Sequence, residues 1–186
     1  MQPNDIALFD RPFIYLRHGE TESNAAKLIA GSWDVALTRK GLAQAGQAAL
    51  NLKGAGIDAI YSSALSRARD TADIIAQELR LPVTAIPELN ERCWGTLERQ
   101  PRSSRVPGMT VDGLEPALDF MNRVTRGFAR VEGRLPLIVA HSGIYRVLCR
   151  MLGLPEAEQP VTNCTPLRFV PPAPGFNVWR VEALVH

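Results

Sequence analysis

The sequence predicts an α/β protein built on a mostly parallel sheet. Short apolar runs typical of strands alternate with segments of helical periodicity along the 186 residues, which is the pattern of repeated βαβ units. The run at 13–16 leads into Arg17 and His18, and the run at 137–140 leads into His141. Because open α/β folds bind ligands at the carboxyl edge of the sheet, both histidines are expected at a binding edge.

Three strands and two helices are expected in the first half of the chain. The strands are the apolar stretches 13–16, 59–61 and 83–86. The first helix begins after Thr38, a favoured N-cap residue, and its expected buried face is Leu42, Ala45, Ala49 and Leu52. The second helix covers about 66–80, and its expected buried face is Ala68, Ala72, Ile75, Ala76 and Leu79.

Residues 87–113 interrupt this alternation, because no hydrophobic period holds there. The stretch 92–105 contains one acid, Glu98, against the arginines Arg92, Arg99, Arg102 and Arg105. Long irregular segments of compact domains are usually functional or disordered, so this one is either a solvated loop or a lid that meets an anionic substrate. We therefore expect a single domain, 1–186, with a short lid or cap excursion at about 91–113.

Regular patterns return after this excursion. A helix face leads into the strand at 137–140 and is marked by Leu114, Leu118, Met121, Phe128 and Val131. A helix at about 144–152 follows and is closed by a glycine and a proline. The stretches 167–170 and 178–185 are expected to be strands at the edge of the sheet.

Composition limits the classes of function. A net charge of +2, without a basic stripe or an aromatic-interleaved basic run, gives no argument for nucleic-acid binding. No apolar run approaches the ~18 residues of a membrane span, and the N-terminus lacks the pattern of a secretory signal. The three cysteines form no CxxC pair and suit a reducing compartment. We therefore expect a cytoplasmic protein that binds neither membrane nor nucleic acid.

His18 is the candidate nucleophile of a phosphate site. Neutral imidazole can attack phosphorus, and a phosphohistidine splits one difficult displacement into two easier ones. Positive charge or hydrogen bonds for the transferred group are expected from Arg17, Arg67 and His141. A metal site built from both histidines and Cys93 is disfavoured, because the two arginines would repel a cation. No GxxxxGK or GxGxxG motif occurs in the sequence, so we expect no cofactor.

A leaving alkoxide also needs a proton, and the segment after the third strand contains two carboxyl groups that can supply it. Glu91 is the candidate acid, and Glu88 is the alternative that spacing alone leaves open. General acid catalysis of this kind is worth ~10²- to 10⁴-fold in rate.

Four ordered motifs span nearly the whole chain. They read LRHGET at 16–21, SSALSRARDTA at 62–72, LNERCWG at 89–95 and VAHSG at 139–143. Together they resemble the motifs of the histidine phosphatase superfamily, also called the phosphoglycerate mutase-like family. The resemblance implies a three-layer α/β/α sandwich, no metal, and a phosphohistidine intermediate.

The resemblance also implies a role for each matching residue. The phosphorylated residue would be His18, and the proton donor would be Glu91. The phosphate pocket would be formed by Arg17, Arg67 and His141. Further contacts with phosphate or substrate are expected from Asn24, Gly31, Arg92, Ser142 and Gly143.

The family contains mutases and phosphatases, and the length of the chain favours a phosphatase. The LNER string is closest to cofactor-dependent phosphoglycerate mutase, but the basic insertion is shortened to roughly 99–107 and the chain stops soon after its last strand. Because an open pocket hydrolyses the phosphoenzyme, we expect a metal-independent phosphomonoesterase acting on a small phosphorylated metabolite. The alternatives are phosphoglycerate mutase-type phosphoryl transfer and a non-catalytic phospholigand-binding module.

Overall fold

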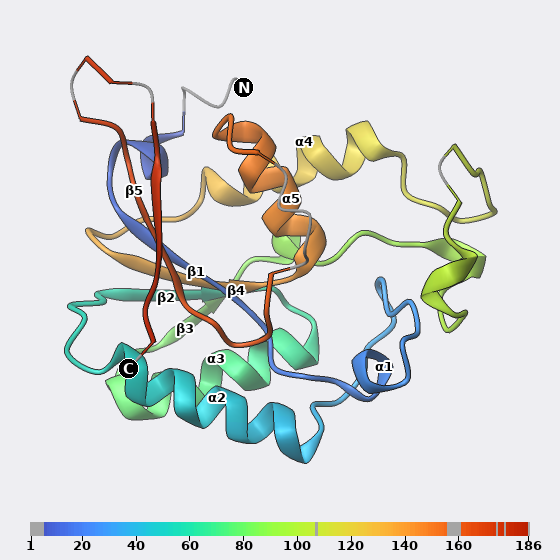
Figure 1. The fold of residues 1–186 in the computed structure, drawn as a ribbon, viewed down its shortest axis with the longest axis horizontal. Helices are drawn as coiled ribbons and strands as arrows, with labels where there is room; N and C mark the ends of the chain where they lie inside the picture. Colours follow the sequence, from blue (N-terminus) through green and yellow to red (C-terminus); the bar gives the residue numbers. More distant parts are fainter. Residues whose placement is uncertain (1–5, 107, 156–160, 174, 177, 186) are drawn as a thin grey trace.

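The computed structural model describes residues 6–106, 108–155, 161–173, 175–176 and 178–185, and its centre is a six-stranded sheet (Figure 1). The strands are β1 (Phe13–Arg17), β2 (Ala59–Ser62), β3 (Val83–Ala85), β4 (Pro136–Ala140), β5 (Leu167–Val170) and β6 (Arg180–Ala183). Their order is β3-β2-β4-β1-β5-β6. The strands β1 to β4 run parallel, whereas β5 is antiparallel to β1 and β6 is antiparallel to β5. The mostly parallel sheet is thus confirmed.

Helices cover both faces of the sheet and make the three layers of an α/β/α sandwich (Figure 1). One face is covered by α2 (Arg39–Leu52) and α3 (Ser66–Leu79), and the other by α4 (Ala117–Phe128) and α5 (Ser142–Met151). The connecting segments contain α1 (Glu22–Ala25) and short 3-10 helices at Ala7–Asp10, Pro87–Leu89, Gly95–Leu97 and Arg102–Ser104. Within the described parts of the chain, no helix has the length and apolar character needed to cross a membrane.

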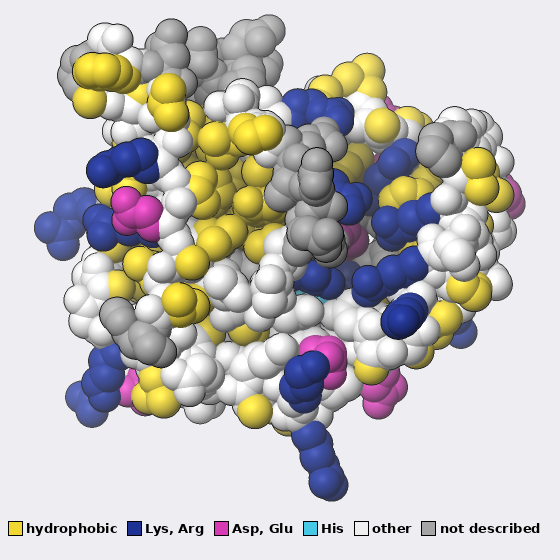
Figure 2. All heavy atoms as spheres, in the orientation of Figure 1, with side chains coloured by type: hydrophobic (Ala, Val, Ile, Leu, Met, Phe, Trp, Pro, Cys, Tyr) yellow, Lys and Arg dark blue, Asp and Glu magenta, His cyan; other side chains and the backbone are white. Residues whose placement is uncertain are grey.

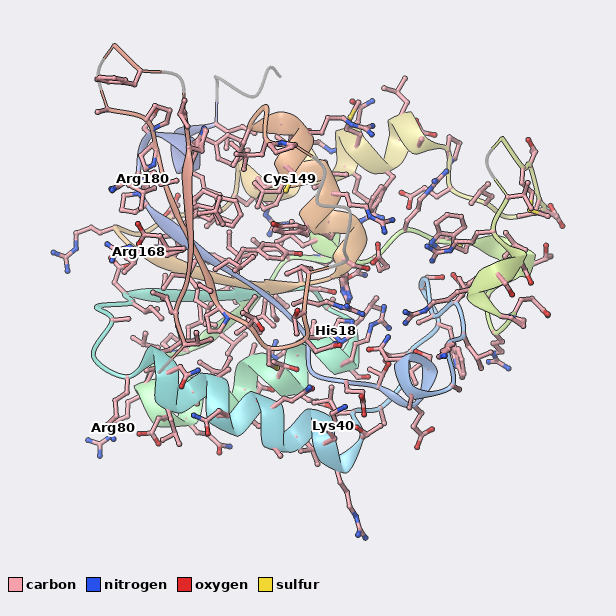
Figure 3. The ribbon with its side chains drawn as sticks, in the orientation of Figure 1. His18, Lys40, Arg80, Cys149, Arg168 and Arg180 are labelled. Atoms are coloured by element: carbon pink, nitrogen blue, oxygen red, sulfur yellow. The ribbon has the colours of Figure 1, made fainter. Side chains whose placement is uncertain are left out.

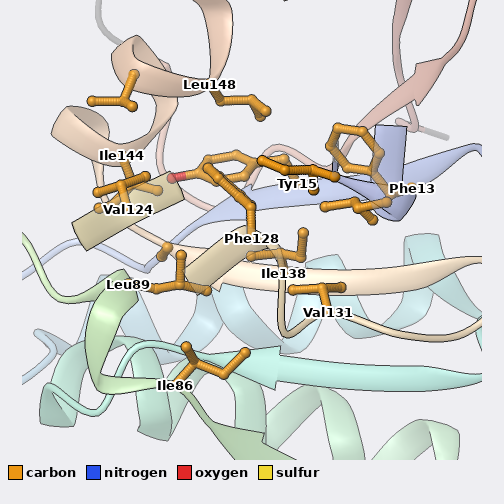
Figure 4. Packing of buried hydrophobic residues seen from close by; sticks show 14 of the residues in the cluster. Phe13, Tyr15, Ile86, Leu89, Val124, Phe128, Val131, Ile138, Ile144 and Leu148 are labelled. Carbon is orange, nitrogen blue, oxygen red and sulfur yellow. The ribbon is translucent and has the colours of Figure 1, made fainter. Parts of the chain in front are cut away.

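Alternate residues of the central strands separate two hydrophobic cores. In β1, Phe13 and Tyr15 pack in the core under α4 and α5, and Ile14 and Leu16 pack in the core over α2 and α3. Figure 4 shows the first of these cores, with Phe128 between the helices and the sheet. All residues of β1 and β4 are buried, as expected for parallel strands covered on both faces. This packing holds the carboxyl ends of the two strands side by side.

Two apolar residues predicted to be buried are exposed. Leu42 is 47% exposed because the first turn of α2 directs Gly41 toward the protein, where an added Cβ would overlap the main-chain oxygen of Glu20. Leu118 is 61% exposed and lies in the first turn of α4. That helix begins only after Pro116, since the residue before a proline avoids helical geometry. The buried face of each helix therefore differs from the predicted one in the first turn.

The segment after β3 is tied to the loop that follows α1. The main-chain N–H of Ile29 donates to the carbonyl of Gln100 at 2.9 Å, and the N–H of Arg99 donates to the carbonyl of Ile29 at 2.8 Å. The N–H of Arg102 donates to the carbonyl of Lys27 at 2.9 Å. In Figure 1 the two segments lie beside each other at the right of the sheet. Together they form one wall of the cavity described next.

Candidate active site

Polar residues at the carboxyl ends of the central strands surround a cavity of about 230 Å³. The predicted site residues that line it are Arg17, His18, Asn24, Gly31, Arg67, Glu91 and Ser142. His141 lies directly behind, with its ring centre 5.1 Å from that of His18. Figure 2 shows Lys and Arg side chains around a hollow with a histidine visible at its base, and Figure 3 shows His18 at the end of β1.

His18 is 4% exposed, and a main-chain carbonyl fixes its tautomer. Nδ1 lies 2.7 Å from the carbonyl oxygen of Gly19, and because a carbonyl can only accept, Nδ1 carries the proton. The lone pair of the neutral ring is therefore on Nε2. Burial, followed by the charges of Arg67 and Arg17, lowers the pKa of His18 well below its usual value. The imidazole is thus neutral at neutral pH, as a nucleophile must be.

Close backbone packing holds the carbonyl that orients His18. The N–H of Gly19 donates to Oγ1 of Thr71 at 3.1 Å. A Cβ on Gly19 would lie 2.5 Å from the carbonyl oxygen of Gly41 at the start of α2. The loop after β1 can therefore approach this helix only with glycine at position 19.

A chain of hydrogen bonds fixes the tautomer of His141. The main-chain N–H of Ala64 donates to Asn90 at 2.8 Å, which identifies the accepting atom of Asn90 as the amide oxygen Oδ1. An amide oxygen can only accept, so the Ser63 hydroxyl, also 2.8 Å from Oδ1, donates to it. The Ser63 oxygen is then free only to accept. Nε2 of His141 lies 2.7 Å from that oxygen and therefore donates to it.

Nδ1 of His141 is the nitrogen without a proton in the neutral ring. It is buried and has no hydrogen-bond partner among the residues that the structure describes. Burial, followed by the charge of Arg67, lowers the pKa of His141 well below its usual value. The ring is therefore neutral in the free protein, and it must gain a proton on Nδ1 before that nitrogen can donate to an anion.

Two buried guanidinium groups complete the centre. Arg17 donates from Nη1 to the carbonyl of Val161 at 2.8 Å, and Arg67 donates from Nη1 and Nη2 to the carbonyls of Trp33 and Gly31 at 2.9 and 2.8 Å. Within the described residues, Nε of each arginine has no partner and no carboxylate pairs with either group. Burial lowers the pKa of both arginines. Because buried charges without a counter-ion are costly, the pocket favours an anion.

Of the two candidate acids, Glu91 reaches the cavity and Glu88 does not line it. Oε1 of Glu91 accepts from the N–H of Arg92, and Oε2 accepts from the N–H of Gly143, both at 2.9 Å. Glu88 pairs instead with Arg130 at 2.6 Å. A Cβ on Gly143 would overlap the Glu91 carboxylate. Gly143, expected to contact phosphate or substrate, therefore positions Glu91 in this structure.

The other expected contacts lie in two places. Asn24, Gly31 and Ser142 line the cavity with His18, and Asn24 also caps α1. Arg92 lines a neighbouring cavity instead. Its Nε donates to the carbonyl of Glu115 at 2.9 Å, so the structure does not bring this side chain to the phosphate pocket.

Three side chains around the site had no role predicted from the sequence. Ser63 and Asn90 lie inside the recognised motifs, but their contact depends on how the turn after β3 meets the end of β2. Arg146 lines the cavity from α5, one turn beyond Ser142. Arg146 follows Ser142 by four residues in an expected helix, a spacing that places both residues on the same helix face and could have indicated its position. In the described part of the chain, no three histidine, cysteine or acidic side chains are placed to hold a metal ion.

A neutral buried histidine facing two arginines at the edge of an α/β/α sandwich is suited to phosphoryl transfer. The chain belongs to the histidine phosphatase superfamily (branch 1), whose family model matches residues 13–170. It is 38% identical over 176 residues, covering 82% of this chain and 81% of the relative, to a protein of Proteus mirabilis named "Probable phosphoglycerate mutase GpmB". It is 33% identical over 146 residues to "Uncharacterized phosphatase PhoE" of Bacillus subtilis, covering 74% and 76%.

A solved structure supports the same assignment. The alpha-ribazole phosphatase from Shigella flexneri superposes with a TM-score of 0.78 at 25% identity, covering 94% of this chain and 96% of that one. The names of these proteins include a mutase and phosphatases. Membership of the family therefore supports enzymatic activity of the phosphatase or mutase kind.

Proposed function

We propose that this protein is a phosphomonoesterase that acts without a metal ion on a small phosphorylated molecule, through a phosphohistidine at Nε2 of His18. The observation that carries the proposal is the Nδ1–H bond from His18 to the carbonyl of Gly19, which leaves Nε2 as the nucleophilic nitrogen beside two buried cations. Arg17 and Arg67 supply the fixed positive charge for the transferring group, as electrostatic stabilisation of phosphoryl transfer requires.

The residues divide the reaction into two half-reactions. In the first, Nε2 of His18 attacks phosphorus, the bond from phosphorus to the ester oxygen breaks, and Glu91 gives a proton to that oxygen. In the second, water attacks phosphorus, the bond to Nε2 breaks, and Glu91 takes up the proton that water releases. Arg17, Arg67 and protonated His141 hold the phosphoryl oxygens in both steps.

We favour hydrolysis over mutase chemistry because Figure 2 shows an open hollow among Lys and Arg side chains, through which water can reach a phosphohistidine in the adjoining cavity. The basic segment that would cover a second phosphate is also short, at roughly 99–107. The mutase reaction is the second candidate, because a relative with 38% identity is named as a mutase.

The test compares the two reactions in one preparation. Purified protein should release phosphate from p-nitrophenyl phosphate equally well with and without a chelator, and faster than it interconverts phosphoglycerates. The His18→Asn variant should lose phosphate release and the acid-labile phosphoenzyme that rapid quenching traps. A chelator-sensitive rate, or a His18→Asn variant that still forms the phosphoenzyme, would contradict the proposal.

A further inference from the structure

The strand β6 forms one outer edge of the sheet. Among the described strands it has a neighbour on one side only, because it comes last in the order β3-β2-β4-β1-β5-β6. All residues of Arg180–Ala183 are exposed. An edge strand presents unpaired main-chain N–H and C=O groups, which can pair with another strand. Figure 3 shows Arg180 at this edge, well apart from His18, so a partner here would leave the site open.

The pairing of β6 with β5 shows which main-chain groups of β6 point outward. The N–H of Leu184 donates to the carbonyl of Pro166 at 2.9 Å, which continues the register of the two strands. In an antiparallel ladder, hydrogen-bonded pairs alternate with pairs that are not hydrogen-bonded. The even-numbered residues of β6 therefore bond to β5, and the N–H and C=O groups of Val181 and Ala183 point away from the sheet.

A second copy of this strand can pair with these groups in an antiparallel arrangement about a two-fold axis. If the axis passes between the two copies of Val181, Arg180 of each copy lies opposite Glu182 of the other. The two nearest registers that use the same outward groups place Arg180 opposite Arg180, or Glu182 opposite Glu182. Directly opposed unlike charges stabilise a strand pair, and like charges destabilise it. The charges of β6 therefore select the register centred on Val181.

The side chains of β6 are available for this contact. Arg180 and Glu182 share one face of the strand, and neither forms an ion pair with a described residue. On the other face, Val181 lies opposite the buried Phe169 of β5 and is itself 38% exposed. In the two-fold pair, the two copies of Val181 cover each other.

Exposed apolar side chains are grouped around this edge. Of the nine large apolar side chains that are exposed among the described residues, four lie within 176–185, namely Phe176, Val178, Val181 and Val185. Figure 2 shows hydrophobic side chains on this hairpin at the upper left. Single exposed apolar residues need no explanation, but a group of them marks a contact with another molecule. A second copy of the strand offers apolar side chains together with the opposite charges in the matching order.

We infer that two copies of this chain form a dimer by antiparallel pairing of their β6 edges, with Arg180 of each copy opposite Glu182 of the other. The sheets of the two copies then form one continuous sheet across the two-fold axis. This dimer does not depend on the activity proposed above, because β6 is separated from β1 and His18 by β5.

Sedimentation velocity of the full chain over a series of protein concentrations tests the dimer. The wild type should change from monomer to dimer as the concentration rises. Arg180→Glu and Glu182→Arg each place like charges opposite each other at both ends of the contact, so each should raise the dimer dissociation constant at least about tenfold. An equimolar mixture of the two variants should dimerise again, because every contact between positions 180 and 182 then joins opposite charges.

The control variant is Arg134→Glu, which reverses the charge of a side chain that is 92% exposed and lies just before β4, inside the strand order. It should dimerise like the wild type, and far-UV circular dichroism should show that every variant is folded. A wild type that stays monomeric at all concentrations would overturn the dimer. Single variants that dimerise as well as the wild type, or a mixture of folded variants that stays monomeric, would overturn the pairing of the β6 edges.

Discussion

Binding of a dianion beside His18 should place a proton on His141. The pKa of His141 is lowered by burial and by Arg67, so the ring is neutral in the free protein at neutral pH. Ser63 accepts the Nε2–H, and Nδ1 is bare and without a partner among the described residues. A dianion bound close to this ring raises the pKa of His141 in the complex. Binding therefore takes up a proton, and affinity rises as the pH falls, by up to about tenfold per pH unit.

The size of the effect follows from the spacing of the two rings. Their centres are 5.1 Å apart, so an anion bound at Nε2 of His18 lies close to His141. Two unit charges about 4 Å apart attract by about 4 kcal/mol at an effective dielectric constant of about 20. That energy raises the proton affinity of His141 by about a thousandfold.

Calorimetric titration with sulfate measures this proton directly. Sulfate stays a dianion across the working range of pH, so any proton taken up must go to the protein. Titrations in buffers of different ionisation enthalpy should give about one proton per sulfate for the wild type. The His18→Gln variant should keep the uptake, and the His141→Gln variant should lose it. If His141→Gln takes up as many protons as the wild type, the assignment of the proton is wrong.

Two substitutions test other parts of the site, and a further pair tests the packing of α2. Ser63→Ala leaves the buried Nε2–H of His141 without an acceptor, which costs about 1–3 kcal/mol and should lower kcat/KM roughly 5- to 150-fold. An unchanged kcat/KM would show that Ser63 has no part in the site. Gly143→Ala displaces the carboxylate of Glu91. Hydrolysis of alkyl phosphates should slow far more than that of p-nitrophenyl phosphate, because the nitrophenolate leaving group needs no proton. Equal losses of rate for the two substrates would argue against Glu91 as the acid. In urea unfolding, Gly41→Ala should lower the free energy of unfolding by about 1–3 kcal/mol. Gly46→Ala in the same helix, with nothing within 4 Å of the added Cβ, should raise it by up to about 1 kcal/mol, and equal effects of the two would contradict the close approach.

Residues placed by strand ends were predictable from sequence. His18 and His141 each follow an apolar run, and the ends of parallel neighbours meet whatever their side chains are. The buried faces of the helices were less predictable in the first turn of each helix. A hydrophobic period does not show whether a neighbouring segment of the chain covers that turn. Leu42 is exposed for this reason, because Gly41 and not Leu42 meets the main chain of Glu20.

The hydrogen-bond network and the roles of single arginines were not predictable. The sequence shows several arginines after the third strand, but not which of them donate to main-chain carbonyls. Arg102 does so across the contact with the loop after α1, and Arg105 stacks on Trp94 instead. These outcomes depend on the tertiary packing of two irregular segments. Local sequence patterns contain no information on such contacts.

The two buried arginines have one effect before substrate binds and another afterwards. In the free protein, Arg17 and Arg67 help to lower the pKa of both imidazoles, which keeps a lone pair on Nε2 of His18. When a phosphate dianion arrives, the same charges are balanced, and His141 can then gain the proton that makes it a donor. A bound metal cation would be repelled by these arginines and would compete for the lone pair. A dianion is therefore the ligand that balances the charge of the two arginines, and its binding favours the protonated form of His141.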